Sequence, residues 1–455
     1  MKLKETFSKQ HLQIAQSIIL VVFFLKIFYI LHFTAYQSSI HNDMASYWNG
    51  AYERAWGDKF SFSQYGVCPP FYIYLCAYLL IFMKSLGLLQ FALPLVIVLN
   101  VLLHSISSYF VYLIVHRLTG RKLMAFGALL FYVFSYTHLY VNALVLPDNL
   151  ATPLLVIVIW IIAFGELNLF SIFGAGLLMG IAIAAKPLFV ILSPVFAWHV
   201  FSRTIKKNRF VYAIVLSIGL VIIPLMTVIE NNAMSKGKVV SLSPTGGVNF
   251  FQGWSQVGQV YSQGWWLYSP GAVDEIYWKS FTAQEPWYHQ GYFYRLGVKA
   301  IERNPSVFLQ KILWFKKLFW GVLAPALSKN LEGYDKIMPV VEWVLFIMFL
   351  CPWILCFSAL RHVCDKSIYF LFSILSVFFV SIYLCGMPER RYLSYVEFLI
   401  IILFFIALDK IISLYRVYKN QIFIYFFCLA SFFFVIMGNI KVTDTFICIS
   451  QVGLD

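Results

Sequence analysis

The sequence predicts an all-α polytopic membrane protein, and two observations support this fold class. Of the 455 residues, 61% are hydrophobic and only 12% are charged, whereas about a quarter of the residues of a soluble domain are charged. The apolar residues are grouped in runs long enough for helices, since crossing a bilayer takes roughly 20 residues. We therefore expect about eleven transmembrane helices.

The formal net charge of +14 is concentrated in short segments between the apolar runs, which indicates membrane topology and not nucleic-acid binding. Lys2, Lys4 and Lys9 precede the first apolar run, 13–32. Because this run is longer than the core of a signal peptide, we expect an uncleaved first helix. The lysines before it favour a cytoplasmic N-terminus. The eight cysteines follow no metal-binding spacing.

The basic residues of the short loops set the direction of the later spans. The run 71–89 could cross the bilayer or lie against it, and the loop charges favour the second arrangement, because a full span there would invert every later loop. The spans are then expected at 89–116, 123–140, 150–164, 169–184, 188–201, 210–228, 338–360, 368–384, 392–408 and 422–437.

Three regions follow from this pattern. Residues 1–229 form an N-terminal transmembrane catalytic module that includes a first outer loop, 36–88, and residues 336–455 form the C-terminal transmembrane helices. Between them, 230–335 is a polar and aromatic extracytoplasmic region. Its end, 304–317, carries apolar residues every three or four positions after Asn304-Pro305, which is typical of an amphipathic helix at the interface.

Five charged residues are predicted at the outer ends of spans: Asp43, Asp148, Lys186, Arg390 and Arg391. A carboxylate in such a place could act as a base or an anchor, and a cation could bind a phosphate. A lipid-phosphate-linked donor would need both, because its anionic head lies at the membrane interface.

Each of these residues also has a plainer explanation. Asp43 and Asp148 could cap the helices that follow them. Lys186 could extend its ammonium group towards the interface. The two arginines could pair with Glu389 or with lipid phosphate.

The histidines and the aromatic residues carry weaker signals. His41 and His138 could bind a metal, but no ligand motif surrounds them, so we assign no metal ligands and leave only a divalent cation open as a cofactor. Five aromatic residues of the extracytoplasmic region are expected in a core or an interfacial belt sooner than as sugar platforms: Trp254, Trp265, Trp266, Trp287 and Tyr288.

Several segments resemble one known family when they are taken in order. Asp43 is followed by Tyr47 and Ala51, and the same loop continues as Pro69-Pro70-Phe71-Tyr72. A glycine-spaced span ends at Lys186-Pro187, a Gly-Gly-aromatic-Gly stretch begins at Gly246, and the Asn304-Pro305 segment closes the large outer region. These segments resemble the GT-C superfamily of integral-membrane glycosyltransferases, in the branch of the dolichyl-phosphate-mannose protein mannosyltransferases and the bacterial lipid A aminoarabinose transferases.

The resemblance implies a GT-C-like fold and an inverting transfer of a hexose or pentose from a polyprenyl-phosphate donor at the extracytoplasmic face. It implies that Asp43, and less directly Asp148, acts in catalysis as a base or acceptor-orienting group. Lys186 with Arg390 or Arg391 would bind the donor phosphate, and Tyr47 and His41 would contact the acceptor or the sugar.

The implied partners are the sugar donor, a lipid, glycan or protein acceptor, and membrane lipids. The chain lacks the large repeat-domain insertion of the best-known protein mannosyltransferases, and its compact form favours a bacterial inner membrane, in lipopolysaccharide or protein glycosylation. Two other function classes stay open: a transporter or flippase of a lipid-linked sugar or another amphiphile, and a non-enzymatic subunit that binds sugar lipids.

Overall fold

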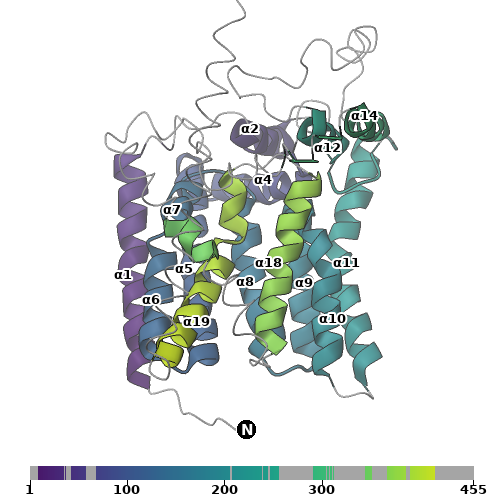
Figure 1. Ribbon diagram of the computed structural model, residues 1–455. Helices are drawn as coiled ribbons and strands as arrows, with labels where there is room; N and C mark the ends of the chain where they lie inside the picture. Colours follow the sequence, from purple (N-terminus) through teal and green to yellow (C-terminus); the bar gives the residue numbers. More distant parts are fainter. Residues whose placement is uncertain are drawn as a thin grey trace, which may run out of the picture.

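Figure 1 presents the computed structural model of the chain, a bundle of helices with further helices across one end. The structure describes residues 9–34, 36, 43–57, 68–204, 208–237, 239–243, 246–255, 290–303, 305–306, 308–309, 311, 344–350, 366–385 and 390–415. These residues contain helices and connecting turns but no β-strand. The predicted all-α class is confirmed for this part of the chain.

Four of the described helical segments are long and apolar enough to cross a membrane. They are α1 (Lys9–Phe33), η1 (Leu89–Phe91) with α5 (Ala92–Thr119), α11 (Arg209–Met234) and α18 (Lys366–Cys385). In Figure 1, α1 and α11 lie at opposite edges of the bundle, and both expose large apolar side chains such as Phe24 and Leu225. The four helices indicate an integral membrane protein, as predicted.

Further helices complete the bundle (Figure 1). They are α6 (Lys122–Val133), α7 (Tyr136–Asn142), α8 (Asp148–Phe164), α9 (Leu169–Ala185), η2 (Pro187–Leu192), α10 (Ser193–Arg203), η7 (Arg390–Tyr395) and α19 (Glu397–Tyr415). The predicted span 422–437 lies outside the described residues, and only 344–350 of the span 338–360 is described, as helix. The total of eleven spans stays a prediction.

Four amphipathic or short helices lie at one end of the bundle, which we call the upper end after its place in Figure 1. They are α2 (Asp43–Trp56), α4 (Pro70–Ser85), α12 (Gly246–Ser255) and α14 (Gln290–Arg303). The helix α4 covers the segment whose placement the sequence left ambiguous. It has 16 residues, fewer than the roughly 20 that a span needs, and it packs on α2.

Of the predicted spans, 123–140 is divided into two helices, whereas 188–201 is one helical segment that changes from 3-10 to α geometry. The span 123–140 breaks at Phe134 and restarts as α7, because the Ser135 hydroxyl accepts the His138 backbone N–H at 3.3 Å and caps a new helix. The span 188–201 begins as the 3-10 helix η2 and becomes α10 at Ser193. Pro187 lies in the first turn of η2 and Pro194 in the first turn of α10. Because proline lacks a backbone N–H, it favours the start of a helix at both places.

Close packing between α9 and α11 depends on glycine. A side-chain Cβ placed on Gly176 would lie 2.5 Å from the Leu216 carbonyl oxygen, and one on Gly219 would lie 2.7 Å from the Phe173 carbonyl oxygen. Both distances are shorter than atoms can approach, so only glycine lets the two backbones come this close. The glycine spacing of α9 therefore fixes the height of its upper end, where Lys186 follows.

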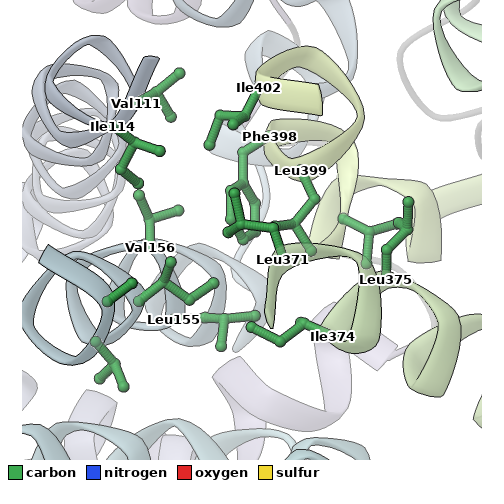
Figure 2. Close-up of a cluster of buried hydrophobic side chains, with 14 of the residues drawn as sticks. Val111, Ile114, Leu155, Val156, Leu371, Ile374, Leu375, Phe398, Leu399 and Ile402 are labelled. Atoms are coloured by element: carbon green, nitrogen blue, oxygen red, sulfur yellow. The ribbon is translucent and has the colours of Figure 1, made fainter. Parts of the chain in front are cut away.

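The centre of the bundle is an apolar core shared by helices distant in sequence. Figure 2 shows Val111 and Ile114 of α5 and Val156 of α8 facing side chains of α18 and α19, including Leu371 and Phe398. All of these side chains are buried. The late helices α18 and α19 therefore complete a core that the earlier helices begin.

The upper-end helices α12 and α14 also meet through glycine. A Cβ on Gly247 would lie 2.4 Å from the Gln290 carbonyl oxygen. Trp254 of α12 is buried and donates its indole N–H to the Leu384 carbonyl oxygen at 2.9 Å, so its expected core role is confirmed. The other four aromatic residues named with Trp254 lie outside the described residues, as does most of the expected helix 304–317.

We predict that Gly176→Ala lowers the stability of the protein by about 1–3 kcal/mol, because α9 and α11 must move apart to admit the methyl group. Gly174→Ala on the same helix is the matched control, since nothing lies within 4 Å of its Cβ position. It should be neutral or slightly stabilising. Thermal unfolding in detergent measures both variants, and equal effects would contradict the packing argument.

Candidate functional site

The segments that the sequence singled out meet at the upper end of the bundle. Tyr47 of α2 is buried, and its ring packs edge-on against Tyr72 of α4, with centroids 5.4 Å apart. Burial raises the pKa of Tyr72 well above its ordinary value, with smaller contributions from Cys76 and from the Asp148 carboxylate. The first outer loop and the start of α8 are therefore electrostatic neighbours.

Asp148 and Lys186 form an ion pair at this end. The Lys186 ammonium nitrogen is 3.5 Å from Asp148 Oδ1, and the two side chains are 17% and 3% exposed. Asp148 is the first residue of α8, and its carboxylate makes no hydrogen bond that caps the helix. Its negative charge suits the helix N-terminus, but its specific partner is Lys186.

Backbone geometry holds Lys186 in place. Its N–H donates to the Ala182 carbonyl oxygen at 2.8 Å, which completes the last turn of α9. Pro187 then ends the helix, because it has no N–H to continue the pattern, and η2 starts there. The Lys-Pro turn thus ends α9 where the Lys186 ammonium group contacts Asp148.

Two tyrosine rings of η7 lie beside the same ammonium group. The Lys186 nitrogen is 5.4 Å from the ring centroid of Tyr392 and 5.2 Å from that of Tyr395. Such cation–π contacts are worth roughly 0.5–2 kcal/mol each, depending on exposure. Tyr395 is fixed in turn by edge-on packing against Phe189 and Phe378.

A second polar cluster lies beneath this site, where α19 begins. Ser135 donates its hydroxyl hydrogen to Glu397 Oε1 at 2.5 Å, and His138 Nε2 lies 3.7 Å from Glu397 Oε2. The rings of His138 and His104 are 4.6 Å apart. All four side chains are buried, and the chain from Tyr395 to Glu397 links this cluster to Lys186.

Buried polar atoms without a hydrogen bond gather in the same part of the bundle. Within the described ranges they include both ring nitrogens of His138, the hydroxyls of Thr137 and Thr152, and the amide of Asn142. Buried polar atoms of proteins are nearly always hydrogen-bonded, to the protein or to water. Their concentration here indicates a region suited to water or to a polar ligand.

The structure brings only some of the predicted residues into view. Asp148 and Lys186 contact each other, and Tyr47 packs on Tyr72, whose pKa the Asp148 carboxylate helps to raise. Asp43 is the first residue of α2. Arg390 and Arg391 begin η7, whose later tyrosines lie on Lys186. The side chains of Asp43, Arg390 and Arg391 lie outside the described part of the chain, as does all of His41.

Sequence reasoning missed Glu397, Lys26, Tyr392 and Tyr395. Lys26 and Glu397 each stand inside a predicted span, and a charged residue within a span is a functional signal by default. That signal was available in the sequence. The role of the two tyrosines was not, because it depends on how η7 is placed over the end of α9.

No group of three or more His, Cys, Asp and Glu side chains among the described residues could hold a metal ion. His138, one of the two histidines considered for that role, instead faces Glu397 and His104. No protein-family model matches the chain, and no curated protein is similar to it.

We predict that Asp148→Asn destabilises the protein by roughly 2–4 kcal/mol, because it leaves the largely buried Lys186 ammonium without its counter-charge. The double variant Asp148→Asn/Lys186→Met should recover part of that loss, since it removes both charges. Unfolding measured for the two single variants and the double variant forms a double-mutant cycle. Additive losses would contradict a direct interaction.

We also predict different effects for two changes at Tyr395. Its hydroxyl has no hydrogen-bond partner among the described residues, so Tyr395→Phe should change stability little. Tyr395→Leu should cost about 1–3 kcal/mol, because it removes the ring beside Lys186 and the packing on Phe189. Thermal unfolding of both variants measures the difference, and an equal loss in both would contradict the ring's role.

Proposed function

We propose that the chain is an inverting membrane glycosyltransferase that moves one sugar from a polyprenyl-phosphate donor to a lipid, glycan or protein acceptor. The observation that carries the proposal is the position of Lys186 at the upper end, between the Asp148 carboxylate and the rings of Tyr392 and Tyr395. Its ammonium group is held in place, and the Lys186 side chain is still 17% exposed. An ordered cation of this kind suits a lipid-linked phosphate.

The reaction is a single displacement. A hydroxyl oxygen of the acceptor attacks the anomeric carbon of the donor sugar, and the bond between that carbon and the phosphate oxygen breaks. The polyprenyl phosphate leaves with the bonding electrons, and the hydroxyl proton passes to a carboxylate. Lys186 stabilises the negative charge that grows on the departing phosphate.

The carboxylates have different proposed roles. Asp148 lies 3.5 Å from Lys186, which suits a group that orients the ammonium. Asp43 is then the proposed base, a role that rests on the resemblance to the GT-C enzymes and on its position at the start of α2. Arg390 and Arg391, at the start of η7, are proposed as further donor-phosphate ligands, and Tyr47 and His41 as contacts of the acceptor or the sugar.

Basic residues support the proposed orientation of this site. Arg117, Arg121, Lys122, Arg203 and Arg209 all lie at helix ends opposite the upper end. Positive residues favour the cytoplasmic side, so we place the upper end outside the cytoplasm. A GT-C-like fold of about eleven spans in a bacterial inner membrane belongs to the same proposal.

A transporter or flippase of lipid-linked sugars is the second candidate function. One observation favours it: Lys26, His104, His138 and Glu397 are buried inside the bundle, and ionisable groups within membrane segments often mark transport pathways. A transporter would move the donor across the membrane without breaking the sugar–phosphate bond. Release of free polyprenyl phosphate therefore separates the two candidates.

The deciding experiment supplies purified protein in lipid vesicles with radiolabelled polyprenyl-phosphate sugars and extracted acceptors. We expect polyprenyl phosphate and a labelled acceptor as products. Asp43→Asn should abolish transfer while donor binding is retained, and Lys186→Met should weaken donor binding at least about tenfold, through loss of a charge-assisted contact. A comparison of glycolipids and glycoproteins in cells with and without the gene identifies the acceptor.

Glu166→Gln is the matched control, because Glu166 is exposed and follows α8 at the end opposite Asp148. It should leave both binding and transfer unchanged. Unchanged glycan profiles in the cells, together with no sugar release by purified protein, would refute the transferase proposal. Donor movement across the vesicle membrane without bond cleavage would establish the transporter instead.

A further inference from the structure

Four titratable side chains from four different helices meet inside the bundle, and a fifth, Lys26, interacts electrostatically with three of them. Lys26 comes from α1, His104 from α5, Tyr132 from α6, His138 from α7 and Glu397 from α19. Each is buried, and the most exposed of them, Lys26, is 8% exposed. We call these residues the interior cluster; α8 adds to it the neutral side chain of Asn149, beside His104.

Lys26 points inward from a helix whose other side is apolar. Its neighbours Phe24, Leu25 and Phe28 are more than half exposed, whereas Lys26 is not. It lies seven residues before the end of α1 at Phe33, or roughly 10 Å below the upper end at the rise of an α-helix. Its ammonium group acts electrostatically on Glu397, His104 and His138.

The two oxygens of the Glu397 carboxylate have different neighbours in the interior cluster. Glu397 Oε1 accepts the Ser135 hydroxyl, but Oε2 lies 3.7 Å from His138 Nε2, which is longer than a hydrogen bond. The ring nitrogens of His104 and His138 make no hydrogen bond of normal geometry within the described ranges. Tyr132 binds Ser107 and packs its ring on His138.

The interior cluster contains both a cationic and an acidic side chain, Lys26 and Glu397, and both are buried. Apolar side chains in these positions would stabilise the protein more than ionisable ones, because burying a charge carries a large desolvation cost. Groups of this kind inside a membrane bundle are typically retained for function.

We propose that the interior cluster is a proton-binding site that takes up a single proton from water. The proton adds to Glu397 Oε2, and His138 Nε2, 3.7 Å away, shares it directly after a small approach or through a water molecule. No other bond forms or breaks. Uptake adds one positive charge to the cluster, and the Lys26 ammonium group, which interacts electrostatically with Glu397, favours the ionised carboxylate before uptake.

Infrared difference spectroscopy of the full chain in lipid nanodiscs tests this site. Spectra are recorded during a pH titration in water and in heavy water, without any sugar donor, so the result does not depend on the transferase proposal. We expect a carboxyl band that appears on acidification and that Glu397→Gln removes. His138→Asn should change its midpoint, because His138 shares the proton.

Two substitutions of Lys26 separate charge from packing. Lys26→Met removes the cation and should raise the midpoint of Glu397 protonation by at least about one pH unit, because the carboxylate loses a positive charge that favours its ionised form. Lys26→Arg keeps the charge and should leave the midpoint nearly unchanged. Lys26→Gln replaces Lys26→Met if the latter does not fold, as judged by size-exclusion chromatography.

Lys410→Met is the matched control. Lys410 lies on the same helix as Glu397 but 13 residues further along, or roughly 20 Å away. It should leave the midpoint unchanged. The proposal is wrong if Glu397→Gln leaves the carboxyl bands unaltered, or if Lys26→Met and Lys410→Met give the same midpoint as the unmodified protein.

Discussion

The ammonium group of Lys186 has to be kept ordered in a largely apolar setting, and the architecture of the upper end follows from that constraint. A buried or half-buried cation needs a counter-charge and polarisable neighbours. Asp148 supplies the first, and the rings of Tyr392 and Tyr395 supply the second. These partners come from α8 and η7. The contacts of the Lys186 ammonium group are therefore complete only when the late segment η7 has packed against the earlier helices.

The helix α19 is tied to the early helices at two levels. Near its start, Glu397 accepts the Ser135 hydroxyl and faces His138. Near its other end, Asp409 Oδ1 lies 2.7 Å from Arg121 Nε, and the Arg121 guanidinium group also donates a hydrogen bond to the Ser413 hydroxyl oxygen at 2.9 Å. Between these polar contacts lies the apolar core of Figure 2. Rigid placement of α19 therefore fixes η7, and with it the tyrosines beside Lys186.

Glycine contributes to the site from a distance. The close approach of α9 and α11 sets where α9 ends, and Lys186 is the residue that follows that end. The break between α6 and α7 has a comparable effect, since it leaves Ser135 and His138 free to meet Glu397 in place of a further helical turn. Irregular backbone at membrane depth is tolerated where it is buried within the protein.

The sequence alone determined the all-α class and most helix positions, because long apolar runs have few other ways to satisfy their backbone in a membrane. It also determined that Asp148 and Lys186 belong near one end of the bundle, since both stand at the limits of apolar runs. It could not determine that they pair, that η7 covers them, or that Lys26 and Glu397 belong to one interior cluster. Those relations join residues far apart in the chain, and only the packing of helices against one another decides which faces, and therefore which side chains, meet.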